Sequence, residues 1–250
     1  MSGHSKWSTI KRQKGVTDAK RGALFTKVAR EISVAARQGG GDPDANYRLR
    51  LAIEKARSVN MPADNIKRTI DKATGGGDAE QFEEIVYEGY GPGGVAVLVE
   101  AATDNRNRTA AVVRSIFTKA GGQLAGSGAV AWQFEPRGLI AVNRGSQDAD
   151  EVALAAIDAG AEDVDTDDPE TIEIYTAPGE LERVRLALDG AGVPVDSAEN
   201  TMIAKQTVEL DSAKARQALR LVEMLEDLED VQRVTANFEI PEDVFAEVAG

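Results

Sequence analysis

The segment TIEIYTAPGELERVRLALDGAGVPVDSAENTMI (Thr171–Ile203) holds a strand, a helix and a second strand in clear succession. Its residues predict a strand over Thr171–Thr176, a helix over Gly179–Ala191 and a strand around Val195–Ile203. This succession of strand, helix and strand is half of a larger unit.

The three elements before this segment complete the unit. The pattern predicts a strand over Leu139–Val142, a helix over Asp148–Ala159 and a strand over Asp163–Thr166. The resulting order, βαββαβ, is that of the ferredoxin-like fold.

A different arrangement precedes this unit. Two β-rich runs, Ile85–Tyr90 and Val95–Ala101, flank GYGPGG and predict a hairpin. A helix over Arg106–Ala120 and a strand over Ala129–Phe134 follow.

A helix (Ser212–Asp227) and a strand (Val231–Ile240) follow the unit and have no partners within it. We therefore expect them to return to the sheet of the preceding domain. This divides the second part of the chain into a middle α+β domain, residues 78–135 plus 205–250, and an inserted ferredoxin-like domain, residues 136–204.

The first 77 residues predict a small three-helix domain. Its first helix spans Gly22–Gln38, with an apolar face and a separate basic face. Asp42 or Asp44 is expected to cap the second helix, and the third begins near Pro62. The predicted fold class is thus α+β and multidomain, with the ferredoxin-like domain inserted in the middle one.

Charge is unevenly distributed along these domains. The chain of 250 residues has a net charge of -13, yet residues 1–77 carry 16 basic and seven acidic residues, a net +9, so the remainder carries -22. Such asymmetry indicates that the basic domain contacts a polyanion. The alternative is a solvated helical surface.

Several functional classes find no support. The chain has no cysteine and one histidine, so thiolate and multi-histidine metal sites are excluded. GYGPGG has the glycine spacing of a dinucleotide loop, but a strand follows it, which favours a turn. DVDTDDPE (Asp163–Glu170) lacks the glycine of a calcium loop and is interpreted as a solvated loop. We expect no enzyme activity, cofactor, metal or small-molecule substrate.

No stretch approaches the length of a membrane helix, so we expect no membrane partner. A cytoplasmic location is the expectation, with mitochondrial import as the minor alternative because the first 40 residues are basic and contain serine. The sequence leaves the oligomeric state open.

Four long segments resemble the YebC/PmpR family, which includes the mitochondrial translational activator of cytochrome c oxidase subunit I. They are SGHSKWSTIKRQKGVTDAKRGALFTKVAREI, DPDANYRLRLAIEKARSVNMPADNIKRTIDKATG, YEGYGPGGVAVLVEAATDNRNRTAAVVRSIF and GGQLAGSGAVAWQFEPRGLI. The resemblance implies a helical domain followed by two α+β domains, one inserted in the other. One departure is TMIAKQTVEL, where Ala204 and Lys205 stand in a region that commonly holds a proline in the family.

The resemblance implies a regulator of gene expression, described either as a DNA-binding transcriptional regulator or as a translation factor acting on the ribosome. Both need a surface that binds phosphates of DNA or ribosomal RNA. A third hypothesis is a scaffold whose acidic body binds a basic protein. Trp7 either stacks on a base or anchors the N-terminal arm to its own domain.

The candidate nucleic-acid ligands are the basic side chains of the first domain with its first aromatic residue. They are His4, Lys6, Trp7, Lys11, Arg12, Lys14, Lys20, Arg21, Lys27, Arg30, Arg37, Arg48, Arg50, Lys55 and Arg57.

A separate candidate anion site lies in TDNRNRT (Thr103–Thr109) of the middle domain. Asp104 or Asn105 is expected to cap the helix that follows, which places Arg106 and Arg108 beside free backbone N–H groups. The alternative is that these arginines pair with nearby carboxylates and fix the loop.

Overall fold

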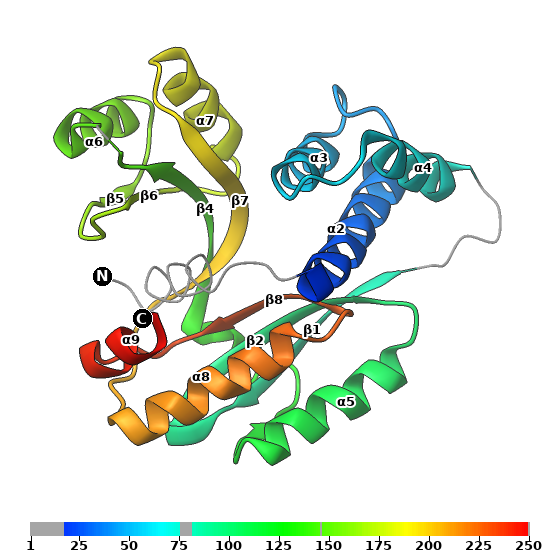
Figure 1. The fold of residues 1–250 in the computed structure, drawn as a ribbon, viewed down its shortest axis with the longest axis vertical. Coiled ribbons are helices and arrows are strands. Elements are labelled where there is room, and N and C mark those ends of the chain that lie inside the picture. The colour runs from blue at the N-terminus through cyan, green and yellow to red at the C-terminus, as the bar shows by residue number, and fades with distance from the viewer. Residues whose placement is uncertain (1–17, 76–81, 146, 250) are drawn as a thin grey trace.

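Three parts make up the molecule: a helical domain and two α+β domains, each of the latter built on a four-stranded antiparallel sheet (Figure 1). The computed structural model describes residues 18–75, 82–145 and 147–249. This arrangement confirms the predicted fold class.

The helical domain packs three helices around an apolar core. They are α2 (Asp18–Gly39), α3 (Tyr47–Ser58) and α4 (Ala63–Thr74). Val28 and Ile32 of α2 meet Leu49 of α3 and Ile66 of α4, as the 3.6-residue periodicity requires. Helix α2 begins four residues before its predicted start.

The cap of α3 differs from the prediction. Asn46, and neither Asp42 nor Asp44, accepts a hydrogen bond from the Leu49 backbone N–H at 3.1 Å. Its amide also donates to the carbonyls of Ala35 and Gly40, each at 2.8 Å. An amide carries both donors and acceptors, so this buried side chain closes the α2–α3 loop from both sides, which a carboxylate cannot do.

The middle domain places helices on one face of its sheet, whose strand order is β3-β1-β2-β8. Its elements are β1 (Glu83–Tyr90), β2 (Ala96–Thr103), α5 (Arg106–Lys119), β3 (Gln123–Leu124), α8 (Ser212–Glu226) and β8 (Val231–Ala236). Helices α5 and α8 bury that face, with Phe117 and Leu221 fully buried against Val97 and Val99 of the sheet. Because β8 pairs with β2, the chain does return to this sheet after the insertion.

The inserted domain has strand order β5-β6-β4-β7, which is the ferredoxin-like arrangement. Its elements are β4 (Phe134–Asn143), α6 (Ala149–Asp158), β5 (Asp163–Asp165), β6 (Thr171–Thr176), α7 (Leu181–Gly190) and β7 (Val195–Ala204). Ile140 and Ile174 of the sheet are fully buried beneath Val184 and Leu188 of α7.

Strands β4 and β7 connect the two α+β domains. They pair from Phe134 opposite Ala204 to Val142 opposite Val195. At the end of the pair where Phe134 lies opposite Ala204, Phe134 packs against Leu98 on the face of the middle sheet that α5 and α8 do not cover. The Lys205 N–H extends the pairing by donating to the Gln133 carbonyl at 2.9 Å, and a proline at that position could not make this bond.

Two local predictions are corrected, and one helix is added. Residues 129–133 are no strand: a short 3₁₀ helix, η2 (Ala131–Gln133), stands there, because the Val130 and Ala131 N–H groups donate to the Glu88 carboxylate and not to a neighbouring strand. Strand β8 ends at Ala236, before the predicted Ile240. The terminal helix α9 (Glu242–Ala249) was not predicted.

The glycine-rich GYGPGG is a turn, as predicted. It forms η1 (Pro92–Gly94) between β1 and β2, with φ of 76° at Gly93 and 81° at Gly94. Glycine adopts these left-handed conformations without a Cβ clash, which explains its use in this tight connection.

We expect Asn46→Ala to lower the free energy of unfolding by about 2 kcal/mol, because it removes a helix cap and the side-chain hydrogen bonds to the buried Ala35 carbonyl and the partly buried Gly40 carbonyl. Urea denaturation followed by circular dichroism measures this. Asp44→Ala is the matched control, since Asp44 is exposed and its side chain caps nothing. Equal loss in the two variants would contradict the assignment.

Candidate nucleic-acid interface

Part of the predicted contact set cannot be placed. His4, Lys6, Trp7, Lys11, Arg12 and Lys14 lie outside the described residues. Lys20 and Arg21 belong to the first turn of α2, and their side chains also lie outside the described part of the chain. The other predicted cations can be followed individually.

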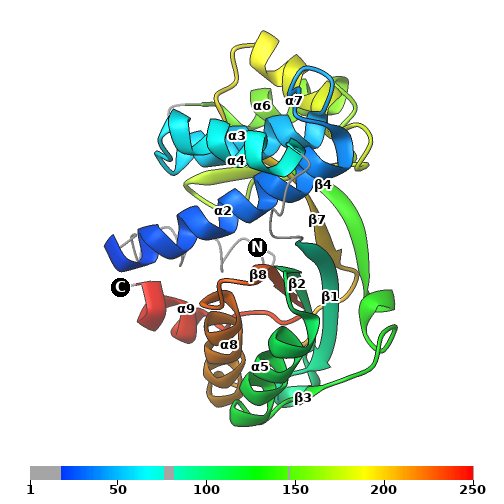
Figure 2. The same cartoon turned by 90° about the vertical axis from the view of Figure 1, so that its right-hand side faces the viewer.

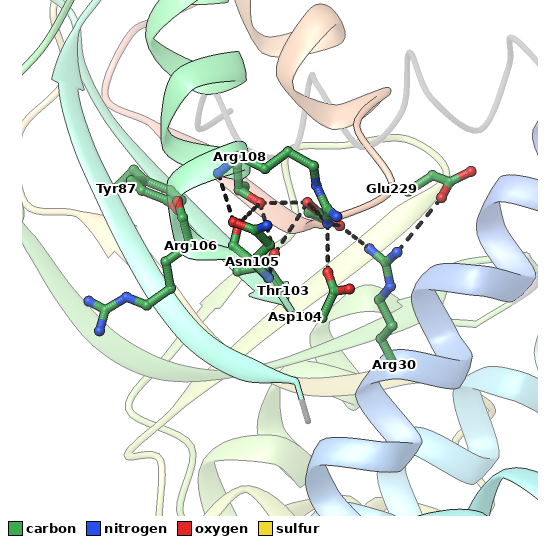
Figure 3. A network of polar contacts seen from close by, with 10 residues as sticks. Arg30, Tyr87, Thr103, Asp104, Asn105, Arg106, Arg108 and Glu229 are labelled. Carbon is green, nitrogen blue, oxygen red and sulfur yellow. Dashed lines mark hydrogen bonds and ion pairs between the residues drawn. The ribbon is translucent and has the colours of Figure 1, made fainter. Parts of the chain in front are cut away.

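Arg30 points out of the helical domain and into the middle domain (Figure 3). Its guanidinium donates to the Asp230 carboxylate at 2.6 Å, and both side chains are only 13% exposed. It also lies 3.7 Å from Glu229 and stacks over the Phe82 ring. Arg30 therefore joins two domains across 200 residues of sequence.

Asp230 accepts further hydrogen bonds from the first turn of α5. Its carboxylate accepts from the Thr109 hydroxyl at 2.5 Å and from Arg108 at 3.0 Å. Burial by itself raises the pKa of Asp230, but these hydrogen bonds and the charge of Arg30 outweigh it, and the pKa lies below its ordinary value. The group is thus held as a carboxylate.

The loop TDNRNRT is fixed by the same network. Asn105 caps α5, as predicted, by accepting from the Arg108 N–H at 3.0 Å. The Arg108 side chain pairs with Asp104 and Asp230, and Arg106 lies 3.8 Å from Glu83. These pairs support the alternative in which both arginines fix the loop.

A hollow of about 300 Å³ adjoins this network. Arg30 and Arg108 line it, but so do Asp104, Glu229 and Asp230. A phosphate placed there would meet three carboxylates, so the surroundings disfavour the predicted anion site.

Lys27 and Arg48 also contact other parts of the chain. The Lys27 amine donates to the Glu226 carbonyl at the end of α8. Arg48 pairs with Glu84 of β1, and its hydrogen bond, partly opposed by burial, lowers the pKa of that carboxyl. Both cations fasten the helical domain to the middle domain.

Arg50 and Lys55 lie on α3. Arg50 is 3.6 Å from Glu182 of α7 and stacks over the Tyr47 ring. Burial raises the pKa of Tyr47 to about 12. Lys55 donates to Glu31 of α2 at 2.8 Å. Arg50 therefore links the helical domain to the inserted one, while Lys55 acts inside its own domain.

Two predicted cations, Arg37 and Arg57, are exposed and make no ion pair within the described residues. Helix α4 adds three exposed cations that lie outside the predicted contact set: Lys67, Arg68 and Lys72. Their positions off the apolar Ile66–Ile70 face of the helix could have identified them. Arg68 donates to the Asn65 side chain at 2.7 Å and to the Asp64 carbonyl, but none of these five exposed cations makes an ion pair within the described residues. Together they form what we call the free basic set.

A cavity of about 750 Å³ lies where the three domains meet. Glu31 and Glu54 line it from the helical domain, Glu100 from β2 and Glu199 from β7. Burial raises the pKa of Glu100. This central surface is mixed in charge with an acidic excess, which makes it unsuitable for a polyanion.

Neither metal clusters nor membrane spans are found in the part of the chain that the structure describes. Residues 18–75, 82–145 and 147–249 contain no group of three metal-ligating side chains. No helix within them is both long and apolar enough to cross a bilayer.

We expect Asp230→Asn to lower the free energy of unfolding at pH 7 by about 2 kcal/mol, because an amide loses the charge-assisted hydrogen bonds to Arg30 and Arg108. Since the native pKa of Asp230 is depressed, its contribution is present above the ordinary pKa and is lost as pH falls through the native one. The deficit should therefore shrink at pH 3.5, measured by urea denaturation at both pH values.

The control is Asp104→Asn, which removes the charge of an exposed carboxylate that also pairs with Arg108. Exposed pairs contribute about 0–1 kcal/mol, so this variant should be close to wild type. A deficit for Asp230→Asn that is the same at both pH values would contradict the role of its charge.

Models of two family domains match nearly the whole chain. Residues 5–76 match the TACO1/YebC protein N-terminal domain, and residues 82–238 match the TACO1/YebC second and third domain.

Relatives of known sequence and structure agree with these matches. A probable transcriptional regulatory protein of Roseiflexus castenholzii is 59% identical over 245 residues, 96% of each chain. One from Rubrobacter xylanophilus is 55% identical over 251 residues, the whole of both chains. The crystal structure of a conserved hypothetical protein from Aquifex aeolicus superposes with a TM-score of 0.85 at 50% identity, covering 90% of this chain and 93% of that one. The chain therefore belongs to the TACO1/YebC family.

Proposed function

We propose that this protein is a regulator of gene expression that binds DNA through phosphate contacts made by its basic helical domain. At the family level, the names of its relatives as probable transcriptional regulatory proteins support a regulatory role. The observation that carries the proposal is the separation of charge between residues 1–77, at +9, and the rest of the chain, at -22.

The contacts between domains narrow the surface that could bind DNA. Lys27, Arg30, Arg48 and Arg50 are engaged by other domains, and Lys55 by its own. The free basic set on α2, α3 and α4 remains, together with the cations of residues 1–21. We propose that these groups neutralise phosphates.

The acidic domains would then act by repulsion. Polyanions are repelled from the middle and inserted domains, so the bound nucleic acid would be confined to the helical domain. Phosphate contacts of this kind supply affinity that falls steeply with salt, but they do not select a base sequence.

Two charge-reversal variants test this proposal: Lys11, Arg12 and Lys14 to Glu, and Lys67, Arg68 and Lys72 to Glu. We expect each to weaken binding to a labelled DNA duplex at least 10-fold at low salt. The slope of log affinity against log salt should fall by about 2–3, since each lost phosphate contact removes about 0.9. Fluorescence anisotropy over a salt series measures both quantities.

The matched control reverses three exposed cations of the middle domain, Arg114, Lys214 and Arg220. It changes the net charge equally but should leave the affinity within about 2-fold. If neither helical-domain variant binds more weakly than this control, the phosphate-contact model is wrong. A clear preference for ribosomal RNA fragments over DNA would instead favour a translation factor.

A further inference from the structure

A second surface, whose residue types are typical of nucleic-acid binding, lies on the middle domain, far along the chain from the basic helices. Trp132 of η2 is 68% exposed, and Tyr90 at the end of β1 is 38% exposed. In Figure 2 the segment between β3 and β4, which carries η2, lies at the edge of the molecule, apart from α2–α4. Neither aromatic belongs to an apolar core cluster.

The two rings are held by a single acceptor. The Trp132 indole N–H donates to the Ala129 carbonyl at 3.1 Å, and the Tyr90 hydroxyl donates to the same carbonyl at 3.0 Å. Because both polar groups are already satisfied, the rings offer mainly their apolar and π surfaces to a partner. Stacking needs only such a surface.

The loop beneath the rings is rigidly supported. Glu88 is only 6% exposed, and its carboxylate accepts from the N–H groups of Gly128, Val130 and Ala131 at 2.6, 2.7 and 2.8 Å. Burial raises the pKa of Glu88, but these three hydrogen bonds outweigh it and the pKa is lowered. An aromatic side chain on a preorganised loop loses little entropy when it binds.

A cation accompanies the rings. The Lys205 amine donates to the Trp132 carbonyl at 3.1 Å and is exposed, so its remaining donors can meet a phosphate. After residue 77 the chain holds 35 of the 42 acids, about one in five residues, yet residues 89–99, 119–134 and 201–208 contain none. The segments that supply Tyr90, Trp132 and Lys205 thus carry no acids of their own, and the Glu88 carboxylate beside them is buried and bound by three N–H donors.

We propose that Trp132, Tyr90 and Lys205 form a stacking site for an unpaired base of single-stranded nucleic acid, with Lys205 contacting the adjacent phosphate. Every base has a π face, so such a site tolerates sequence and discriminates single strands from duplexes, whose bases are stacked on each other. The site rests on the proposed nucleic-acid function and extends it with a preference for single-stranded or locally opened strands.

The chain has two tryptophans, and this makes the site directly observable. In a Trp7→Phe background Trp132 is the sole indole, and oligothymidine should quench its fluorescence as a base stacks on it. In a Trp132→Phe background the same titration reports Trp7 alone. An unchanged Trp132 emission at saturating oligothymidine would overturn the proposal.

Binding variants give the second measurement. Trp132→Ala should weaken binding of labelled oligothymidine about 5-fold or more while changing duplex binding less than 2-fold, and Trp132→Phe, which keeps a π face, should recover most of the affinity. Leu154→Ala is the control, because Leu154 is exposed to a similar degree, 62%, on the inserted domain. Thermal melting checks that all three variants fold.

The outcomes separate this site from the proposed function. If Trp132→Ala binds oligothymidine as wild type does, or weakens duplex and single strand equally, the stacking site is wrong. If at the same time charge reversal on α4 still weakens binding, the proposed function stands. If the wild-type protein binds neither probe, both proposals fail.

Discussion

The partly buried carboxylate of Asp230 is the contact on which the assembly of this molecule depends. It immediately precedes β8 and accepts from Arg30 of the helical domain and from Arg108 and Thr109 of α5. Its backbone carbonyl also receives the Ala102 N–H at the end of β2. A desolvated charge is stable only when donors surround it, so the helical domain, the α5 loop and the sheet must all come together at this point.

This constraint changes the meaning of the basic domain's charge. Several cations of the helical domain pair with carboxylates of the neighbouring domains: Arg48 pairs with Glu84, and Arg50 lies beside Glu182. The net charge of +9 is therefore larger than the charge that a nucleic acid can meet. The remaining cations, the free basic set, face outward on α4 and at the ends of α2 and α3. Lysine and arginine thus either join domains or face solvent, according to the face of the helix that carries them.

The second α+β domain could be predicted well because its pairing is largely local. Strands of the βαββαβ unit are joined by short helices, and alternating apolar residues specify which face is buried. Predictions failed where a side chain distant in the sequence determines the local backbone conformation or supplies the helix cap. Ala129–Phe134 has the composition of a strand, but Glu88 binds its N–H groups; Asp42 and Asp44 are good capping residues, but only Asn46 also reaches the Ala35 and Gly40 carbonyls.

The sequence by itself determined the class of the fold, the insertion of one domain in another, the polarity of charge along the chain and the family. The first three follow from periodicity and composition, which are properties of neighbouring residues, and the family follows from the resemblance of four long segments. Tertiary structure alone decided which cations are free, because Arg30 and Arg57 look alike in sequence and differ only in whether a carboxylate some 200 residues away lies opposite. It also decided that Tyr90 and Trp132 share one carbonyl, since a hydrogen bond across 39 residues leaves no local pattern.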